Sequence, residues 1–185
     1  MKKIWNKGNK LFLEDGQVIF LTKDMKEKFS IGNREYITDE EFEALIYFRV
    51  KLSAYNMLLK RDYFKKEFSD KLRAKHNFPL IVERVVEYFV ENGHLNDVER
   101  AYSYARVHSN YGKRKLSYNF QQMGVSKDII EDIVLENEDE EIENIQKLWL
   151  KLGNKDYNKK VASLIRKGFV YSDIKRAISS LEEED

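Results

Sequence analysis

A three-fold repeat constrains the fold of this chain more than any other feature of its sequence. Three segments align as a helix, a turn and a second helix: FSDKLRAKHNFPLIVERVV, LSYNFQQMGVSKDIIEDIV and VASLIRKGFVYSDIKRAI. Their turns fall at Asn77, Gly124 and Gly168, which are 47 and 44 residues apart. A period of this size is typical of stacked helical units that cannot bury their apolar faces alone. The sequence therefore predicts an all-α fold of three tandem three-helix repeats in a curved stack.

Capping signals place the boundaries of the predicted parts. Thr38 and Glu41 have the spacing of a capping box at the start of the first helix. Pro79 fits the first turn of a third helix, which Asn92-Gly93 would end. We expect helical repeats over residues 38–92, 93–137 and 138–185.

Residues 1–37 lack helical spacing and predict a small N-terminal β ribbon. Two apolar runs flank Asp15-Gly16, which is a strong hairpin signal. A second short strand pair is expected around Gly32-Asn33. A ribbon of this size is unstable alone, so it should pack against the helices that follow.

Composition argues against several kinds of site. The chain has no cysteine, which excludes disulfides and thiolate zinc sites. His76, His94 and His108 lack metal-binding spacing, so we expect them at the surface or in turns. The eight glycines form no phosphate-binding loop, and no segment has the length and apolarity of a membrane span or signal peptide. We expect a cytoplasmic, monomeric protein that is not an enzyme and holds no cofactor or metal.

The middle turn, FQQMGVSKDII, has the outline of a helix-turn-helix DNA reader. Such a motif needs a small residue about four positions before the turn glycine, but Phe120 stands there. The following helix would also present Asp128, Glu131, Asp132 and Glu136 to DNA phosphates, which repel carboxylates. We therefore interpret this turn as the joint of a repeat and not as a reader of bases.

The middle repeat resembles the RecX family, whose members regulate the RecA recombinase. The resemblance rests on ENGHLNDVERAYSYARVHSNYGKRKLSYNFQQMGVSKDII, on LIRKGFVYSDI in the third repeat and, more loosely, on LKRDYFKKEFSDKLRAK. It covers about residues 40–180. Asn96 departs from a family aspartate and Arg100 from a family aromatic residue. Both positions are expected to set helix starts and packing, so the expected fold is unchanged.

The resemblance implies a protein that binds RecA and its DNA filament. Such a protein limits filament growth or promotes disassembly, which lowers recombinase and co-protease activity and so affects DNA repair, recombination and the SOS response. Non-specific contact with the DNA backbone is a further expectation. The alternative is a general nucleic-acid-binding helical repeat without a role at RecA.

Positive charge on neighbouring repeats gives the expected contact residues. The net charge is only +1, but nine of the 32 acidic residues lie in ENEDEE and EEED, which leaves 33 basic residues against 23 acidic ones elsewhere. Such an excess favours a polyanion or an acidic protein surface. The residues that we expect to contact the partner are Lys113, Arg114 and Lys115, followed by Lys159, Lys160, Arg166 and Lys167.

Overall fold

A computed structural model of the chain describes residues 1–136 and 138–183. The chain forms two compact units: unit 1 comprises Met1–Tyr63 and Phe68–Leu95, and unit 2 comprises Phe64–Glu67 and Asn96–Asp185. The expected boundary after residue 137 and the last two acids of EEED lie outside the described residues. The division into one ribbon and three repeats therefore stays a prediction.

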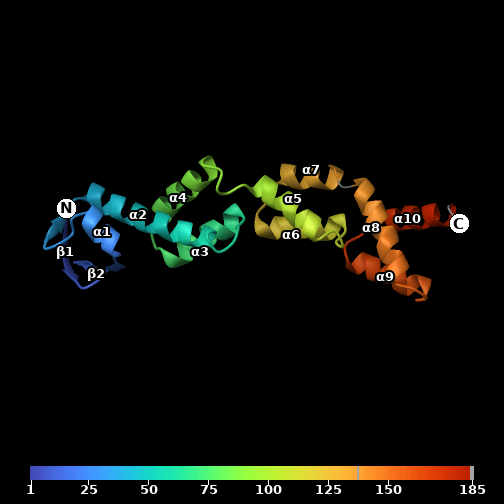
Figure 1. Ribbon diagram of the computed structural model, residues 1–185, viewed down its shortest axis with the longest axis horizontal. Coiled ribbons are helices and arrows are strands. Elements are labelled where there is room, and N and C mark those ends of the chain that lie inside the picture. Colours follow the sequence, from blue (N-terminus) through green and yellow to red (C-terminus); the bar gives the residue numbers. More distant parts are fainter. Residues whose placement is uncertain (137, 184–185) are drawn as a thin grey trace. The chain divides into compact units, whose positions relative to one another are not determined.

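Unit 1 begins with a four-stranded antiparallel sheet of order β3-β2-β1-β4. Two of these strands, β1 and β2, are labelled in Figure 1. Its strands are β1 (Lys2–Lys7), β2 (Lys10–Leu13), β3 (Val18–Phe20) and β4 (Tyr36–Ile37). The predicted hairpin around Asp15-Gly16 is confirmed, because β2 pairs with β3 and Gly16 adopts φ +84°. Gly supplies this left-handed conformation without a Cβ penalty.

The second predicted strand pair, around Gly32-Asn33, is wrong. Residues before that turn form the helix α1 (Lys23–Lys28), where Thr22 accepts a hydrogen bond from the Met25 amide at 3.2 Å. Only β4 follows the turn, and it pairs with β1. The physical reason is burial, since Met25 is 1% exposed and enters the core from one face of a helix.

Three further helices complete unit 1: α2 (Asp39–Leu58), most of α3 (Lys65–Lys75) and α4 (Pro79–Glu91). The predicted capping box is present, with Thr38 Oγ1 accepting from the Glu41 amide at 3.1 Å and Glu41 Oε2 accepting from the Thr38 amide at 3.0 Å. Arg34 also pairs with Glu41 at 2.6 Å. Pro79 lies in the first turn of α4, as expected. The sheet and these helices share one hydrophobic core.

Unit 2 contains α5 (Asp97–Val107), α6 (Lys113–Met123), α7 (Lys127–Glu136), α8 (Glu138–Lys151), α9 (Tyr157–Arg166) and α10 (Tyr171–Glu183). One core joins α5, α6 and α7 around the fully buried Phe120. A second core joins α8, α9 and α10 around Phe169. The two helical trios of unit 2 thus have separate cores, and Phe120 fills the place where a DNA reader needs a small residue.

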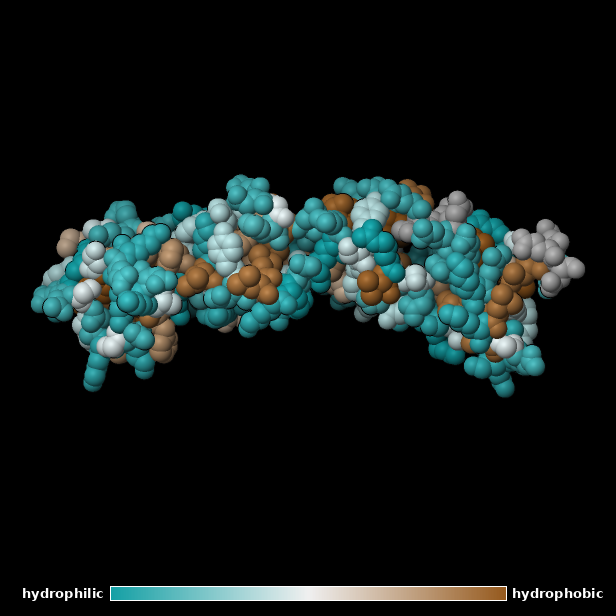
Figure 2. All heavy atoms as spheres, viewed as in Figure 1, coloured by the Kyte–Doolittle hydropathy of each residue, from teal (hydrophilic) through white to brown (hydrophobic). Residues whose placement is uncertain are grey.

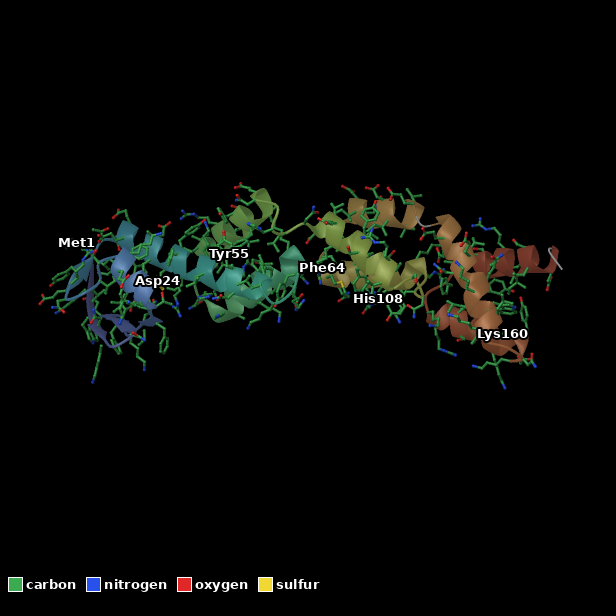
Figure 3. All side chains as sticks on the ribbon, viewed as in Figure 1. Met1, Asp24, Tyr55, Phe64, His108 and Lys160 are labelled. Carbon is green, nitrogen blue, oxygen red and sulfur yellow. The ribbon has the colours of Figure 1, made fainter. Side chains whose placement is uncertain are left out.

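Two departures from the family pattern have structural roles in unit 2. Asn96 caps α5 by accepting a hydrogen bond from the Glu99 amide at 3.1 Å. The Arg100 guanidinium lies 5.0 Å from the ring centre of Phe64 (labelled in Figure 3), which belongs to the first core of this unit. The expectation that these positions set a helix start and packing is confirmed.

His76 lies in the turn between α3 and α4, as expected for the histidines, but its side chain is buried. Its side chain is only 4% exposed, and burial lowers its pKa to about 4, with smaller contributions from the positive charges of Arg49 and Lys75. His94 is exposed, and His108 stacks on Tyr104 with ring centres 3.9 Å apart. His76 is therefore a neutral core residue at neutral pH.

The predicted fold class is confirmed as mainly helical with a small N-terminal antiparallel sheet. None of the helices in the described part of the chain combines the length and apolarity that a membrane span needs.

Candidate partner-binding surface

The start of α6 carries three consecutive cations, which a helix N-terminus disfavours because its dipole is positive there. Gly112 occupies the N-cap position and offers no side chain to the first turn. Glu141 instead accepts a hydrogen bond from the Lys113 amide at 3.0 Å, although it lies 28 residues further along the chain. Asp173 pairs with the Lys113 ammonium at 2.6 Å. Two carboxylates from the third helical trio thus neutralise this helix start.

Backbone hydrogen bonds join the same helix start to the turn between α9 and α10. The Gly112 amide donates to the Lys167 carbonyl at 2.9 Å, and the Arg114 amide donates to the Gly168 carbonyl at 3.2 Å. We call this pair of contacts the α6–α9 junction. A Cβ on Gly112 would lie 2.3 Å from the backbone nitrogen of Phe169, so only glycine fits there. The repeat turn at Gly168 is therefore also a docking point for α6.

The junction brings two of the predicted basic groups together. Arg114 and Lys115 lie beside the turn that carries Arg166 and Lys167, as the hydrogen bonds of the junction require. Arg114 and Arg166 are exposed, whereas Lys115 and Lys167 are half-buried. The Lys115 ammonium lies 3.8 Å from the ring centre of Tyr111, where the ring face attracts a cation. Of these four cations, Arg114 and Arg166 are therefore the two that are exposed to solvent.

Lys113 differs from its two neighbours. Its side chain is 28% exposed and that of its partner Asp173 only 12%, so this ion pair is largely shielded from water. An ion pair in such a setting holds the helix to its neighbour more than it offers charge to a ligand. Lys113 stays a predicted contact residue, and the structure also gives it a role in joining α6 to α10.

Lys159 and Lys160 lie in the first turn of α9, further from the junction (Figure 3 labels Lys160). Arg166 follows Lys159 by seven positions, which places them on one side of the helix about 10 Å apart along its axis. Lys159 is exposed, but the Lys160 ammonium lies 4.6 Å from the ring centre of Trp149. Lys159 can extend the positive surface, while Lys160 mainly covers a core aromatic residue.

An exposed face of α6 continues from Arg114 and was not predicted. Ser117, Tyr118 and Gln121 follow Arg114 at the i+3, i+4 and i+7 positions of the helix, and the four residues together are called the α6 face. They line a shallow depression of about 380 Å³ together with Lys113 and Val134. Tyr118 is 62% exposed. The helical spacing from Arg114 is the signal that could have identified these residues in the sequence.

The neighbouring helix α7 has the opposite charge. Asp128, Glu131, Asp132 and Glu136 are all exposed. A hydrogen bond with Glu136, together with burial and the nearby negative charges, raises the pKa of Tyr102. This carboxylate surface repels a phosphate backbone, so the helix after Gly124 is unsuited to reading DNA.

The surface around the start of α6 is suited to binding. The viewed side of the molecule is mainly hydrophilic, with hydrophobic residues in separate patches (Figure 2). Within residues 1–136 and 138–183, no group of three His, Cys, Asp or Glu side chains could hold a metal ion. The α6 face offers cationic, aromatic and amide groups around one shallow depression, which is the composition of many protein interfaces.

Comparison with known proteins adds a consistent set of relatives. No protein-family model matches the chain. The chain is 26% identical to the regulatory protein RecX of Clostridioides difficile (strain 630), over 92% of this chain and 88% of that protein. It is 28% identical to the regulatory protein RecX of Streptococcus sanguinis (strain SK36), over 95% of this chain and 73% of that protein.

Solved structures agree with these sequence matches. The crystal structure of RecX from Lactobacillus salivarius superposes with a TM-score of 0.69 at 26% identity, covering 75% of this chain and 98% of that one. A second crystal structure of a regulatory protein RecX has a TM-score of 0.60 at 18% identity and covers 95% of this chain and all of that one, which shows a shared fold.

Proposed function

Because the chain belongs to the RecX family of regulatory proteins, we propose that it binds RecA and its DNA filament and mainly inhibits recombinase and co-protease activity. The observation that carries the proposal is the similarity to regulatory proteins named RecX over more than nine tenths of the chain. In this proposal the protein acts in the cytoplasm as a monomer, by binding and not by catalysis. Its action would affect DNA repair, recombination and the SOS response.

We place the contact on the α6 face and on the arginines at the α6–α9 junction. Arg114 is exposed and belongs to both features, and Arg166 is exposed at the end of α9, two residues before the Gly168 carbonyl that accepts from the Arg114 amide. Exposed cations of this kind raise association rates with an acidic protein surface or a phosphate backbone, and salt weakens the effect. Tyr118 is the largest exposed side chain of the α6 face and is suited to be an aromatic anchor at an interface.

Measurement of RecA-catalysed strand exchange and ATP hydrolysis, with and without the protein, tests the proposal. We expect inhibition that depends on protein concentration. Unchanged strand exchange and ATP hydrolysis at a saturating concentration would refute a role at RecA. Tight binding to DNA without RecA, combined with no effect on RecA, would favour the general nucleic-acid-binding alternative.

The double variant Arg114→Glu/Arg166→Glu tests the location of the contact. We expect about tenfold weaker inhibition at 0.1 M salt and a smaller difference at higher salt, because the contribution is electrostatic. Lys23→Glu/Lys60→Glu is the matched control, since both lysines are exposed in unit 1 and the change in net charge is the same. Equal inhibition by the double variant and the control would place the contact elsewhere.

A further inference from the structure

The N-terminal sheet has one face that is buried and one that is not. Strand residues that point inward are almost fully buried, and none of them is more than 2% exposed: Ile4, Leu11, Leu13, Ile19 and Ile37. The residues between them point to the other face, because side chains alternate along a strand. On that outer face Trp5 is 50% exposed, Phe20 57% and Tyr36 47%. Large aromatic side chains thus occupy the solvent side of a sheet whose other side already forms the core.

Strand register gathers these aromatic residues. Trp5 on β1 lies opposite Phe12 on β2, and Phe12 lies opposite Val18 on β3. The rings of Trp5 and Phe12 are stacked, with centres 5.5 Å apart and an angle of 6° between their planes. The outer face therefore carries a pair of parallel rings with a neighbouring apolar residue.

Lysines surround this aromatic pair. The four strands contain four lysines and no acidic residue. Lys3, Lys7 and Lys10 are exposed and alternate with the inward residues, so they share the outer face with Trp5 and Phe12. The Lys10 ammonium lies 5.3 Å from the ring centre of Phe20. The outer face is therefore uniformly positive as well as aromatic.

Lys7 and Lys10 are direct cross-strand partners. Like charges at directly opposite positions destabilise a sheet. Lysines can protect an edge strand from pairing with another chain, but β1 and β2 are the two central strands of this sheet. Edge protection therefore does not explain them, whereas a negatively charged ligand on this face would relieve their repulsion.

We propose that the outer face of this sheet binds single-stranded DNA, with bases stacked on Trp5 and its aromatic neighbours and phosphates held by Lys3, Lys7 and Lys10. Aromatic platforms flanked by cations suit single strands because unpaired bases expose faces that can stack, while a duplex hides them. The choice of DNA as the occupant rests on the proposed function, which already brings the chain to a DNA filament. The site itself lies in unit 1 and shares no residue with the α6 face.

Fluorescence anisotropy with a labelled oligo(dT) of about 20 nucleotides tests the site on the full chain without RecA. We expect Trp5→Ala and Phe20→Ala each to weaken binding about fivefold or more, the loss typical of one base–aromatic stack. Lys7→Gln should lower the slope of log affinity against log salt by about 0.7. Tyr171→Ala removes an aromatic residue of similar exposure (54%) in unit 2 and is the matched control. Circular dichroism verifies that each variant is folded.

A second measurement observes the platform directly. The chain has two tryptophans, so Trp149→Phe leaves Trp5 as the single tryptophan reporter. We expect oligo(dT) to quench Trp5 fluorescence and a duplex of equal length to leave it nearly unchanged.

Several results would overturn the inference. One is that oligo(dT) does not quench Trp5 fluorescence, and another is that a duplex binds as tightly as oligo(dT). Oligo(U) that binds as tightly as oligo(dT), or more tightly, would make RNA the occupant. A loss of affinity in Tyr171→Ala equal to that in Trp5→Ala would also overturn it. Since RecA is absent from both measurements, oligo(dT) binding by a chain that leaves RecA unaffected would refute the proposed function and leave this site standing. Inhibition of RecA by a chain that does not bind oligo(dT) would refute only the site.

Discussion

Replacement of Gly112 by alanine tests the physical basis of the α6–α9 junction. Gly112 has φ −78° and ψ 164°, a conformation that alanine adopts without strain. The added Cβ, however, would lie 2.3 Å from the Phe169 nitrogen, 2.4 Å from the Gly168 carbonyl carbon and 2.5 Å from its oxygen. All three are backbone atoms, so no flexible side chain can move aside. The turn must shift by about 1 Å to reach ordinary contact distances.

That shift would break both hydrogen bonds of the junction, which are now 2.9 and 3.2 Å long. Each contributes about 1 kcal/mol net, and alanine is a poorer N-cap than glycine. The lower entropy of the unfolded alanine chain offsets about 0.5 kcal/mol of this loss. We therefore expect Gly112→Ala to destabilise the protein by about 2–3 kcal/mol, measured as a lower unfolding midpoint in urea by circular dichroism.

Gly153→Ala is the control that separates crowding from backbone strain. Gly153 has φ +58°, but no atom lies within 4 Å of the position that a Cβ would occupy, so alanine there meets strain alone, about 1 kcal/mol. Backbone conformation by itself predicts that Gly153→Ala is the more harmful change, and packing predicts the reverse. A Gly112→Ala protein that is as stable as the wild type, or more stable than Gly153→Ala, would refute the packing argument.

Two further predictions concern buried charge. The pKa of about 4 for folded His76 lies below the ordinary value of 6.5, so the folded state binds fewer protons and its stability falls as pH drops from 6.5 towards 4. Urea unfolding should show a loss of about 2 kcal/mol in the free energy of unfolding between pH 7 and pH 5. His76→Phe should remove most of this loss, and an unchanged loss would show that another group titrates. For Lys113 and Asp173, a double-mutant cycle with alanine should give a coupling free energy of about 1–3 kcal/mol, whereas a value near zero would show that the pair does not join α6 to α10.

Local patterns in the sequence predicted the helices and their turns well. The capping box at Thr38 and Glu41 forms as expected because both partners lie within one helical turn. Phe120 is buried because the apolar residues around it recur at helical spacing. Signals of this kind need only a few neighbouring residues, so a single sequence contains them.

Features that depend on distant residues were missed. Strand β1 is rich in lysine and looks polar, and its place in the sheet is set by pairing with β2 and with β4, which lies more than thirty residues away. His76 stands between a lysine and an asparagine, and only the packed core makes it a buried residue. The basic groups around Arg114 and Arg166 were predicted one by one, but the junction that brings them together depends on contacts across two helical trios.

The hydrogen bonds at the start of α6 also have a consequence for the order in which the protein can form on the ribosome. The first two helical amides of α6 find their acceptors on Glu141 and on the Gly168 carbonyl, both made later than the helix itself. Synthesis proceeds from the N-terminus at about 5–20 residues per second. For the first few seconds after its emergence, α6 therefore lacks these acceptors, and its first turn is completed only when the polypeptide up to residue 168 is free to fold.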